Sequence, residues 1–195
     1  MQLALFDFDG TITRKDSLID FIYYAVGPFS ALTGFCCLTP LLMAYLLKAI
    51  PNDRTKTIVL SYFFKGWDEK RFQKIAQDFS LTKIDHLVKE SACQKIQWHQ
   101  KQGHKVVIIT ASIENYLQDW CTHLHIGLIG TRLEFKEGKY TGKLATPNCH
   151  GPEKVRRLLQ IYNLDDFEFI YAYGDTPSDY ALKGISNEFH FRSFQ

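Results

Sequence analysis

Three strongly apolar segments constrain the fold most, because each of them ends in residues with side-chain oxygens. Residues 3–8 (LALFDF) contain Asp7 and are followed directly by Asp9, residues 105–110 (KVVIIT) end in threonine, and residues 167–175 (FEFIYAYGD) end in aspartate. Continuous apolar runs rich in β-branched or aromatic residues are typical of strands buried on both faces of a sheet. We therefore expect these segments to be interior strands, with residues 186–191 (SNEFHF) as a fourth strand.

Helical patterns separate the strands. Residues 112–124 (SIENYLQDWCTHL) begin with a serine that suits an N-cap, and residues 151–162 (GPEKVRRLLQIY) carry a proline in the first turn. Residues 131–144 alternate around KEGK and predict a β-hairpin. The alternation predicts an α/β fold with a Rossmann-like parallel sheet and helices on both faces. Ligands bind beyond the carboxyl ends of such strands, so the side-chain oxygens should meet there.

One region interrupts this alternation. Residues 14–87 have helical periodicity throughout and fall between the first and second strands. We expect residues 1–13 and 88–195 to form the catalytic core and residues 14–87 to form an all-helical cap. An insertion after the first strand would lie over the active edge of the sheet.

The cap contains a long uncharged segment, residues 21–47, which runs for 27 residues without a charge. A membrane span needs about 20 apolar residues, but this segment is too short for two crossings, and Gly27, Pro28 and Pro40 break it. Basic residues flank both ends, which favours the cytoplasmic side at each end. Three interpretations remain open: a buried cap core, a membrane-contacting or re-entrant hairpin, and an apolar groove for a substrate or partner.

Composition excludes several classes of protein. The 195 residues are 46% hydrophobic and 23% charged, and a net charge of +2 gives no reason to expect nucleic acid as a partner. The five cysteines show no CxxC spacing, so neither a disulfide framework nor a zinc site is indicated. The sequence shows no secretory signal, and we expect a cytoplasmic protein, with membrane contact through residues 21–47 as an open alternative.

Four carboxylates should meet at the strand ends, namely Asp7, Asp9, Asp175 and Asp179. Carboxylates gathered at one edge repel each other unless a cation compensates their charge. Hard oxygen donors with room for water favour Mg²⁺ over zinc. The pattern therefore predicts a magnesium site.

Four motifs now carry a family resemblance. In chain order, FDFDGT, VVIITAS, GPEKV and YGDTPSD resemble the motifs of the haloacid-dehalogenase-like phosphohydrolases. The insertion resembles the helical cap of the branch that contains phosphoserine phosphatase. The resemblance implies a Mg²⁺-dependent enzyme that hydrolyses a phosphate monoester through an aspartyl-phosphate.

The resemblance also implies roles for the four acids. Asp7 matches the nucleophile and a metal ligand. Asp9 matches the general acid and base, and its backbone carbonyl matches a metal ligand. Asp175 matches a direct metal ligand, and Asp179 matches an acid that contacts the metal indirectly, through water or through a direct ligand. Asp179 also suits the first turn of a helix, where an acid complements the dipole.

A second set of residues matches the phosphate-binding groups of the family: Gly10, Thr11, Thr110, Ala111 and Lys154. Ser112 is an alternative hydroxyl donor to Thr110. Lys154 falls in the first turn of a predicted helix, where the dipole disfavours a cation, so it makes sense there if it faces an anion.

Substrate choice depends on the cap. Asp16 lies where phosphoserine-phosphatase-like enzymes contact the substrate amine, and it equally suits the N-cap of a helix that begins near Leu18. Arg54 or Lys56 falls near the position that holds the substrate carboxylate, although we expect both at the surface. The apolar segment favours a lipid phosphate, because the architecture resembles that of haloacid-dehalogenase-like phosphatidylglycerophosphatase. A small soluble ester, such as phosphoserine or phosphocholine, and a non-catalytic binding protein are the alternatives.

Overall fold

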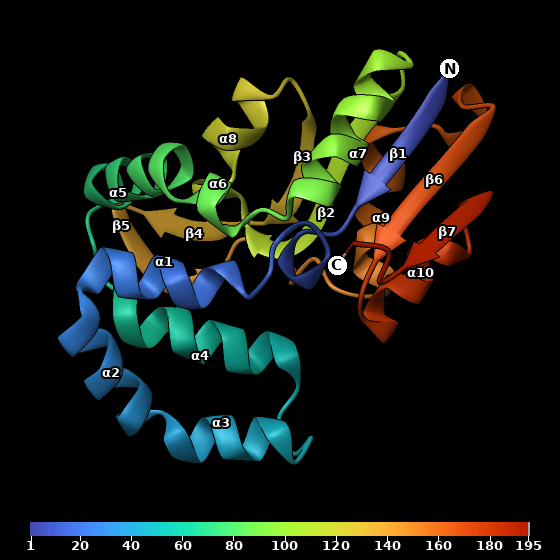
Figure 1. Ribbon diagram of the computed structural model, residues 1–195. Coiled ribbons are helices and arrows are strands. Elements are labelled where there is room, and N and C mark those ends of the chain that lie inside the picture. The colour runs from blue at the N-terminus through green and yellow to red at the C-terminus, as the bar shows by residue number, and fades with distance from the viewer. Residues whose placement is uncertain (195) are drawn as a thin grey trace.

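The computed structural model describes residues 1–194 and shows a parallel sheet with a helical insertion at one end (Figure 1). Five parallel strands lie in the order β3-β2-β1-β6-β7. Their bounds are β1 Gln2–Phe6, β2 Lys105–Ile113, β3 Gly127–Thr131, β6 Phe169–Gly174 and β7 Glu188–Phe191. The hairpin strands β4 (Leu133–Lys136) and β5 (Lys139–Leu144) pair separately. The predicted α/β fold is confirmed.

Helices cover both faces of the sheet because the side chains of the strands alternate. Leu3 and Leu5 of β1 enter one apolar cluster, and Ala4 and Phe6 enter the other. The cluster with Leu3 and Leu5 packs against α9 and α10, and the other packs against α7 and α8. The bounds of these helices are α7 Glu90–Lys101, α8 Gln118–His123, α9 Pro152–Ile161 and α10 Tyr180–Lys183.

Two elements differ from the sequence prediction. The predicted helix over 112–124 is wrong at its start, because β2 continues to Ile113 and α8 begins only at Gln118, after a helical turn over Glu114–Tyr116. Strand β3 was not predicted at all. It is short and contains two glycines, and it lies at the edge of the sheet, where it pairs only with β2.

The insertion is helical throughout. Its helices are α1 Ser17–Val26, α2 Pro28–Cys37, α3 Thr39–Leu46, α4 Asn52–Phe64, α5 Glu69–Thr82 and α6 Ile84–Leu87. The chain enters and leaves it through an antiparallel bridge between Thr13 and Val88. The Arg14 N–H donates to the Leu87 carbonyl at 2.9 Å beside that bridge.

The cap has an inner and an outer layer. Figure 1 shows α2 and α3 on the outer side of α1 and α4, away from the sheet. Helix α1 buries Phe21 among aromatic rings of α4, α5 and Tyr116, whereas every side chain of α3 is exposed or half-buried. The buried-core interpretation of the uncharged segment therefore holds for α1 and fails for α3.

The helices of the described chain, residues 1–194, are all too short or too polar to cross a membrane singly. Helices α1 and α2 reach the required length and composition only as a pair, and a bend of 120° separates them.

Candidate active site

The carboxyl ends of β1, β2 and β6 bring together groups that are far apart in the sequence. They form the floor of a cavity of about 600 Å³, which we call the strand-end cavity. Its lining includes Asp7, Asp9, Thr110, Ala111 and Lys154 from the core. Residue Asp7 follows the last paired residue of β1, and its N–H donates to the Tyr173 carbonyl of β6 at 2.9 Å.

A tight turn over Phe8–Ile12 follows β1 and contains Asp9 and Gly10 of the first motif. Gly10 adopts a φ of +78°, which only glycine adopts readily. A Cβ atom there would lie 2.3 Å from Oδ2 of Asp175, so the position also has no space for a side chain. The turn thereby brings the backbone of the first motif against a carboxylate that lies 165 positions further along the chain.

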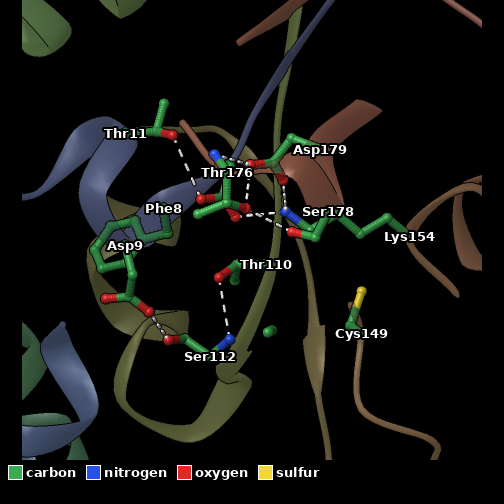
Figure 2. A network of polar contacts seen from close by, with 12 residues as sticks. Phe8, Asp9, Thr11, Thr110, Ser112, Cys149, Lys154, Thr176, Ser178 and Asp179 are labelled. Carbon is green, nitrogen blue, oxygen red and sulfur yellow. Dashed lines mark hydrogen bonds and ion pairs between the residues drawn. The ribbon is translucent and has the colours of Figure 1, made fainter. Parts of the chain in front are cut away.

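Lys154 joins two carboxylates at the bottom of the cavity. Its Nζ donates to Oδ1 of Asp7 at 2.5 Å and to Oδ1 of Asp179 at 2.6 Å. Figure 2 shows the lysine reaching toward Asp179 from α9. All three side chains are buried. The lysine in the first turn of α9 therefore faces anions, as the dipole argument requires.

Burial and charge set the ionisation of this cluster. Desolvation raises the pKa of Asp7 to about 7 even though Lys154 lowers it. Desolvation also acts to raise the pKa of Asp179, but Lys154 and Thr176 hold it below its ordinary value. Burial would lower the pKa of Lys154, and the two aspartates raise it instead. The cluster thus keeps a charged lysine and lacks a second positive charge near Asp7.

A divalent cation fits this donor set. Asp7, Asp175 and Asp179 each place a carboxylate oxygen within 4.8 Å of the others. One lysine cannot compensate three buried or half-buried carboxylates, and the negative charge of Asp179 adds to the burial that raises the pKa of Asp7. Oxygen donors alone favour Mg²⁺ over zinc. These three residues would hold the ion.

Asp9 has a different environment from Asp7. Its Oδ1 accepts from the Ser17 N–H at 2.7 Å, and its Oδ2 accepts from the Ser112 hydroxyl (Figure 2). Desolvation, together with the charge of Asp16, raises its pKa. Its side chain thus lies apart from the three clustered carboxylates, and its pKa is higher than that of an exposed aspartate.

The end of β2 supplies the hydroxyl of Thr110. The register of β2 against β3 shifts between Ile109 and Ile113, and such an irregularity frees residues from the ladder. Thr110 Oγ1 lines the cavity and accepts from the Ser112 N–H at 3.0 Å, which leaves its own proton to donate. Ser112, the alternative donor, instead directs its hydroxyl to Asp9.

Gly10 and Thr11 were both expected among the phosphate-binding groups. Neither residue lines the strand-end cavity. The Gly10 N–H donates to the Thr13 hydroxyl at 3.2 Å, and the Thr11 hydroxyl donates to Oδ1 of Asp175 at 3.1 Å. The turn aims these groups back at the protein, so both residues position the carboxylates.

Comparison with known proteins now identifies the family. A model of the haloacid dehalogenase-like hydrolases matches residues 4–182, which include all four motifs. Protein CicA of Caulobacter vibrioides is 33% identical over 195 residues, covering 99% of this chain and 86% of its own. The chain belongs to the haloacid dehalogenase-like hydrolase family.

Solved structures share the fold of this hydrolase. A protein of unknown function from Bordetella pertussis has a TM-score of 0.81 at 22% identity, covering 96% of this chain and 88% of its own. A substrate-bound phosphoserine phosphatase has a TM-score of 0.68 at 15% identity, covering 97% of this chain and 84% of its own. At these identities the likeness concerns the fold alone.

The cap of the hydrolase supplies further residues to the strand-end cavity. Lys56 lines it and donates to the Ala111 carbonyl at 2.8 Å, so the expected surface position is wrong for Lys56, whereas Arg54 is exposed. Position 56 lies one turn after Asn52, on the side of α4 that faces the core. Asp16 caps α1, accepting from the Leu18 N–H at 2.9 Å, and also lines the cavity.

Sequence reasoning missed Tyr45, Asn52 and His150, which also line the cavity. The position of His150 directly before the Gly-Pro start of α9 was the one available signal, because that turn leads to Lys154. The sequence contained no signal for Tyr45 and Asn52, because they reach the cavity only when the cap is folded. Asn52 additionally accepts from the amide of Asn148 at 2.8 Å, which links the cap to the core.

Proposed function

We propose that this hydrolase is a Mg²⁺-dependent phosphatase that hydrolyses a phosphate monoester through a phosphorylated Asp7. One observation carries the proposal: the Asp7 carboxylate lies at the floor of a cavity, held by Lys154 and within 4.8 Å of two further carboxylates. Such a cluster suits an anionic phosphate only if a cation is bound with it. Mg²⁺ would supply charge neutralisation for the phosphate oxygens when bound.

The first step is attack by Asp7. A carboxylate oxygen of Asp7 forms a bond to phosphorus, and the bond from phosphorus to the ester oxygen breaks. Asp9, whose raised pKa favours the protonated form, gives its proton to the leaving oxygen, so the alcohol departs neutral. Lys154 and the Thr110 hydroxyl are placed to stabilise charge on the phosphoryl oxygens.

The second step releases phosphate. Asp9, now ionised, takes a proton from water, and the water oxygen bonds to phosphorus as the bond to Asp7 breaks. The Ser112 hydroxyl and Ser17 N–H that bind Asp9 stabilise its ionised form in this step. Asp9 thus alternates between acid and base, while Asp7 carries the phosphoryl group.

The alcohol part of the substrate would lie toward the cap. A second cavity of about 380 Å³, the cap cavity, adjoins the strand-end cavity and shares Asp16, Tyr45, Asn52 and Lys56 with it. Much of its remaining lining is apolar: Leu18, Ile19, Ile22, Tyr23, Phe35, Leu42 and Val59. This lining supports a lipid phosphate, such as phosphatidylglycerophosphate, as the substrate.

One observation favours a second candidate. Asp16 and Lys56 carry opposite charges and line both cavities, between the phosphate end and the apolar end. A small zwitterionic ester such as phosphoserine would place its amine near Asp16 and its carboxylate near Lys56. A substrate panel separates this candidate from a lipid phosphate.

The test measures phosphate release by purified protein, with Mg²⁺ or with EDTA, from phosphoserine, phosphocholine and detergent-dispersed lipid phosphates. We expect Mg²⁺-dependent release, highest with the lipid phosphates. In Asp7→Asn, release should fall by ~10³-fold or more, because the variant lacks the attacking oxygen. Asp165→Asn, at an exposed position, is the matched control and should retain activity. Full activity of Asp7→Asn would overturn the proposal.

A further inference from the structure

The outer layer of the cap exposes a set of large apolar side chains. On α2, Phe29 is 80% exposed and Leu32 is 56% exposed; at the end of α3, Leu46 and Leu47 are 70% and 76% exposed. Met43 lies one turn before Leu46 and is also exposed. We call these five residues the outer apolar face. Isolated exposed leucines are ordinary, but a group on two consecutive helices indicates a binding surface.

Helix α3 is unusual in its packing. It has eight residues, TPLLMAYL, and none of its side chains is buried. Short helices are marginal in water unless an apolar face packs against a partner. Its Leu42 and Tyr45 line the cap cavity, while Met43 and Leu46 point outward. A helix that is apolar on both sides is typical of a buried or membrane-associated position.

The charges around the outer apolar face favour an anionic partner. Residues 21–52 contain a single charged residue, Lys48, and the exposed Asp53 and Arg54 follow directly. Both basic side chains are exposed, and neither forms an ion pair with any residue in the described part of the chain. A bilayer with anionic lipids offers an apolar interior beneath a negative surface, which complements this arrangement.

The geometry indicates docking on one leaflet. The 120° bend between α1 and α2 and the shortness of each helix do not give a straight span. Helix α1 also buries Leu18, Phe21 and Ile22 within the protein. The outer helices α2 and α3 can lie along the surface of a bilayer while α1 stays in the cap.

The cap cavity lies on the inner side of the same helices. Phe35 of α2 and Leu42 and Tyr45 of α3 line it, and it joins the strand-end cavity at Lys56. The outer apolar face and the cavity are thus separated only by the thickness of this helical layer. A lipid in the bound leaflet would be close to the site that cleaves its phosphate.

We propose that the outer apolar face, with Lys48 and Arg54 at its rim, docks the protein on the surface of an anionic phospholipid bilayer. The delivery of a lipid phosphate from that bilayer rests on the proposed function, whereas the docking itself does not.

The test is co-sedimentation of the purified protein with vesicles of phosphatidylcholine containing roughly 30% phosphatidylglycerol. We expect binding that weakens with added salt and that falls with vesicles of phosphatidylcholine alone. The double variant Leu46→Asp, Leu47→Asp should bind at least about tenfold more weakly, because two apolar side chains no longer enter the bilayer. Lys48→Glu, a change at an exposed position, should reduce binding to the anionic vesicles selectively.

The chain offers a matched control. Leu32 on α2 is 56% exposed and Leu159 on α9 is 54% exposed, and both lie within helices. Leu32→Asp should weaken vesicle binding, and Leu159→Asp should leave it unchanged. Equal loss in both variants, or no sedimentation of the unmodified protein, overturns the docking proposal.

Two further outcomes separate the alternatives. If the unmodified protein forms a dimer that Leu46→Asp, Leu47→Asp dissociates, and vesicles do not bind it, the face belongs to a second copy of the chain and the proposal fails. Asp7→Asn should sediment with vesicles as the unmodified protein does, since Asp7 lies at the floor of the strand-end cavity. Loss of catalysis and loss of docking are therefore measured independently.

Discussion

The floor of the strand-end cavity and the outer layer of the cap both depart from the usual distribution of side chains, in opposite directions. The cavity floor buries charges at Asp7, Lys154 and Asp179, and the cap exposes apolar side chains such as Leu46 and Leu47. In the core, most of the anomaly is compensated within the chain by ion pairs and hydrogen bonds. In the outer cap layer, no residue of the described chain covers the exposed apolar side chains.

The difference shows two kinds of functional site. At the cavity floor, an excess of negative charge remains after internal pairing, and a small cation is sufficient to balance it. At the outer cap layer, the uncovered area is apolar and broad, and only another extended surface can bury it. Substitutions in the two regions should therefore affect different properties.

Removal of the buried lysine should have the largest effect on the core. Lys154→Met keeps the length of the side chain but leaves Asp7 and Asp179 without their ion pair. The free energy of unfolding should fall by about 3–5 kcal/mol, and phosphate release should fall by ~10³-fold. Urea denaturation in EDTA and a phosphate assay measure the two effects. Lys101→Met, at an exposed position, should change neither.

The sign of the pH dependence follows from the same charges. Without Lys154, the folded-state pKa of Asp7, which is already raised to about 7, rises further, and the pKa of Asp179 rises from below its ordinary value. The folded variant therefore binds more protons than the folded unmodified protein. The destabilisation should therefore be small at about pH 4 and grow as the pH rises above the unfolded carboxyl pKa. A destabilisation that is constant between about pH 4 and pH 8 would contradict the assignment of a charged pair.

A substitution at Gly10, in the turn after β1, should reduce stability less than Lys154→Met does. In Gly10→Ala, the new Cβ would meet Oδ2 of Asp175 at 2.3 Å in a backbone with φ of +78°. We expect a loss of stability of about 1–3 kcal/mol and a higher Mg²⁺ requirement, because Asp175 must move. Gly103→Ala is the control: its φ is +74°, and nothing lies within 4 Å of its Cβ. If both variants need the same Mg²⁺ concentration, Gly10 does not position Asp175.

Ser112 should control the pH profile. Its hydrogen bond lowers the pKa of Asp9, so in Ser112→Ala that pKa should rise further. Because Asp9 must be ionised for the second step, the acid limb of the phosphate-release profile should move to higher pH, with a loss of roughly tenfold in rate. Ser80→Ala removes another buried serine hydroxyl and should leave the profile in place. An unmoved acid limb in Ser112→Ala would contradict the role of Asp9.

The smallest effect on folding is expected in the outer cap layer. Leu47→Ala should change the free energy of unfolding by less than about 0.5 kcal/mol, because the Leu47 side chain is already mostly exposed in the folded protein. Leu60→Ala, at a fully buried position of α4, should reduce it by about 2–5 kcal/mol. Chemical denaturation measures both. Similar losses would show that Leu47 packs within the protein and would remove the contrast between the two regions.

The strand ends were predictable because their chemistry is local. An apolar run followed by aspartate or threonine identifies both the strand and its polar end, and parallel topology then places the ends together. Asp16 as an N-cap was predictable for the same reason, since its partners Leu18 and Ile19 follow directly.

Features that depend on distant contacts were not predictable. We predicted a helix cap at Ser112, but the residue continues β2 and its hydroxyl donates to Asp9, which lies 103 residues away. The inward position of Lys56 depends on how α4 packs against β5, and it brings the Lys56 ammonium to the Ala111 carbonyl. Gly10 and Thr11 were expected to face phosphate, and the turn directs their donors to Thr13 and Asp175 instead.

The most direct test of the central claim is to locate the phosphoryl group during turnover. In Asp9→Asn, a substrate with a good leaving group, such as p-nitrophenyl phosphate, needs little acid in the first step, while the second step lacks its base. Acid quenching followed by peptide mass spectrometry should then find one phosphoryl group, stable to acid and released by hydroxylamine, on Asp7. An acid-labile group on His150, or turnover without any covalent phosphoryl group, would contradict the account.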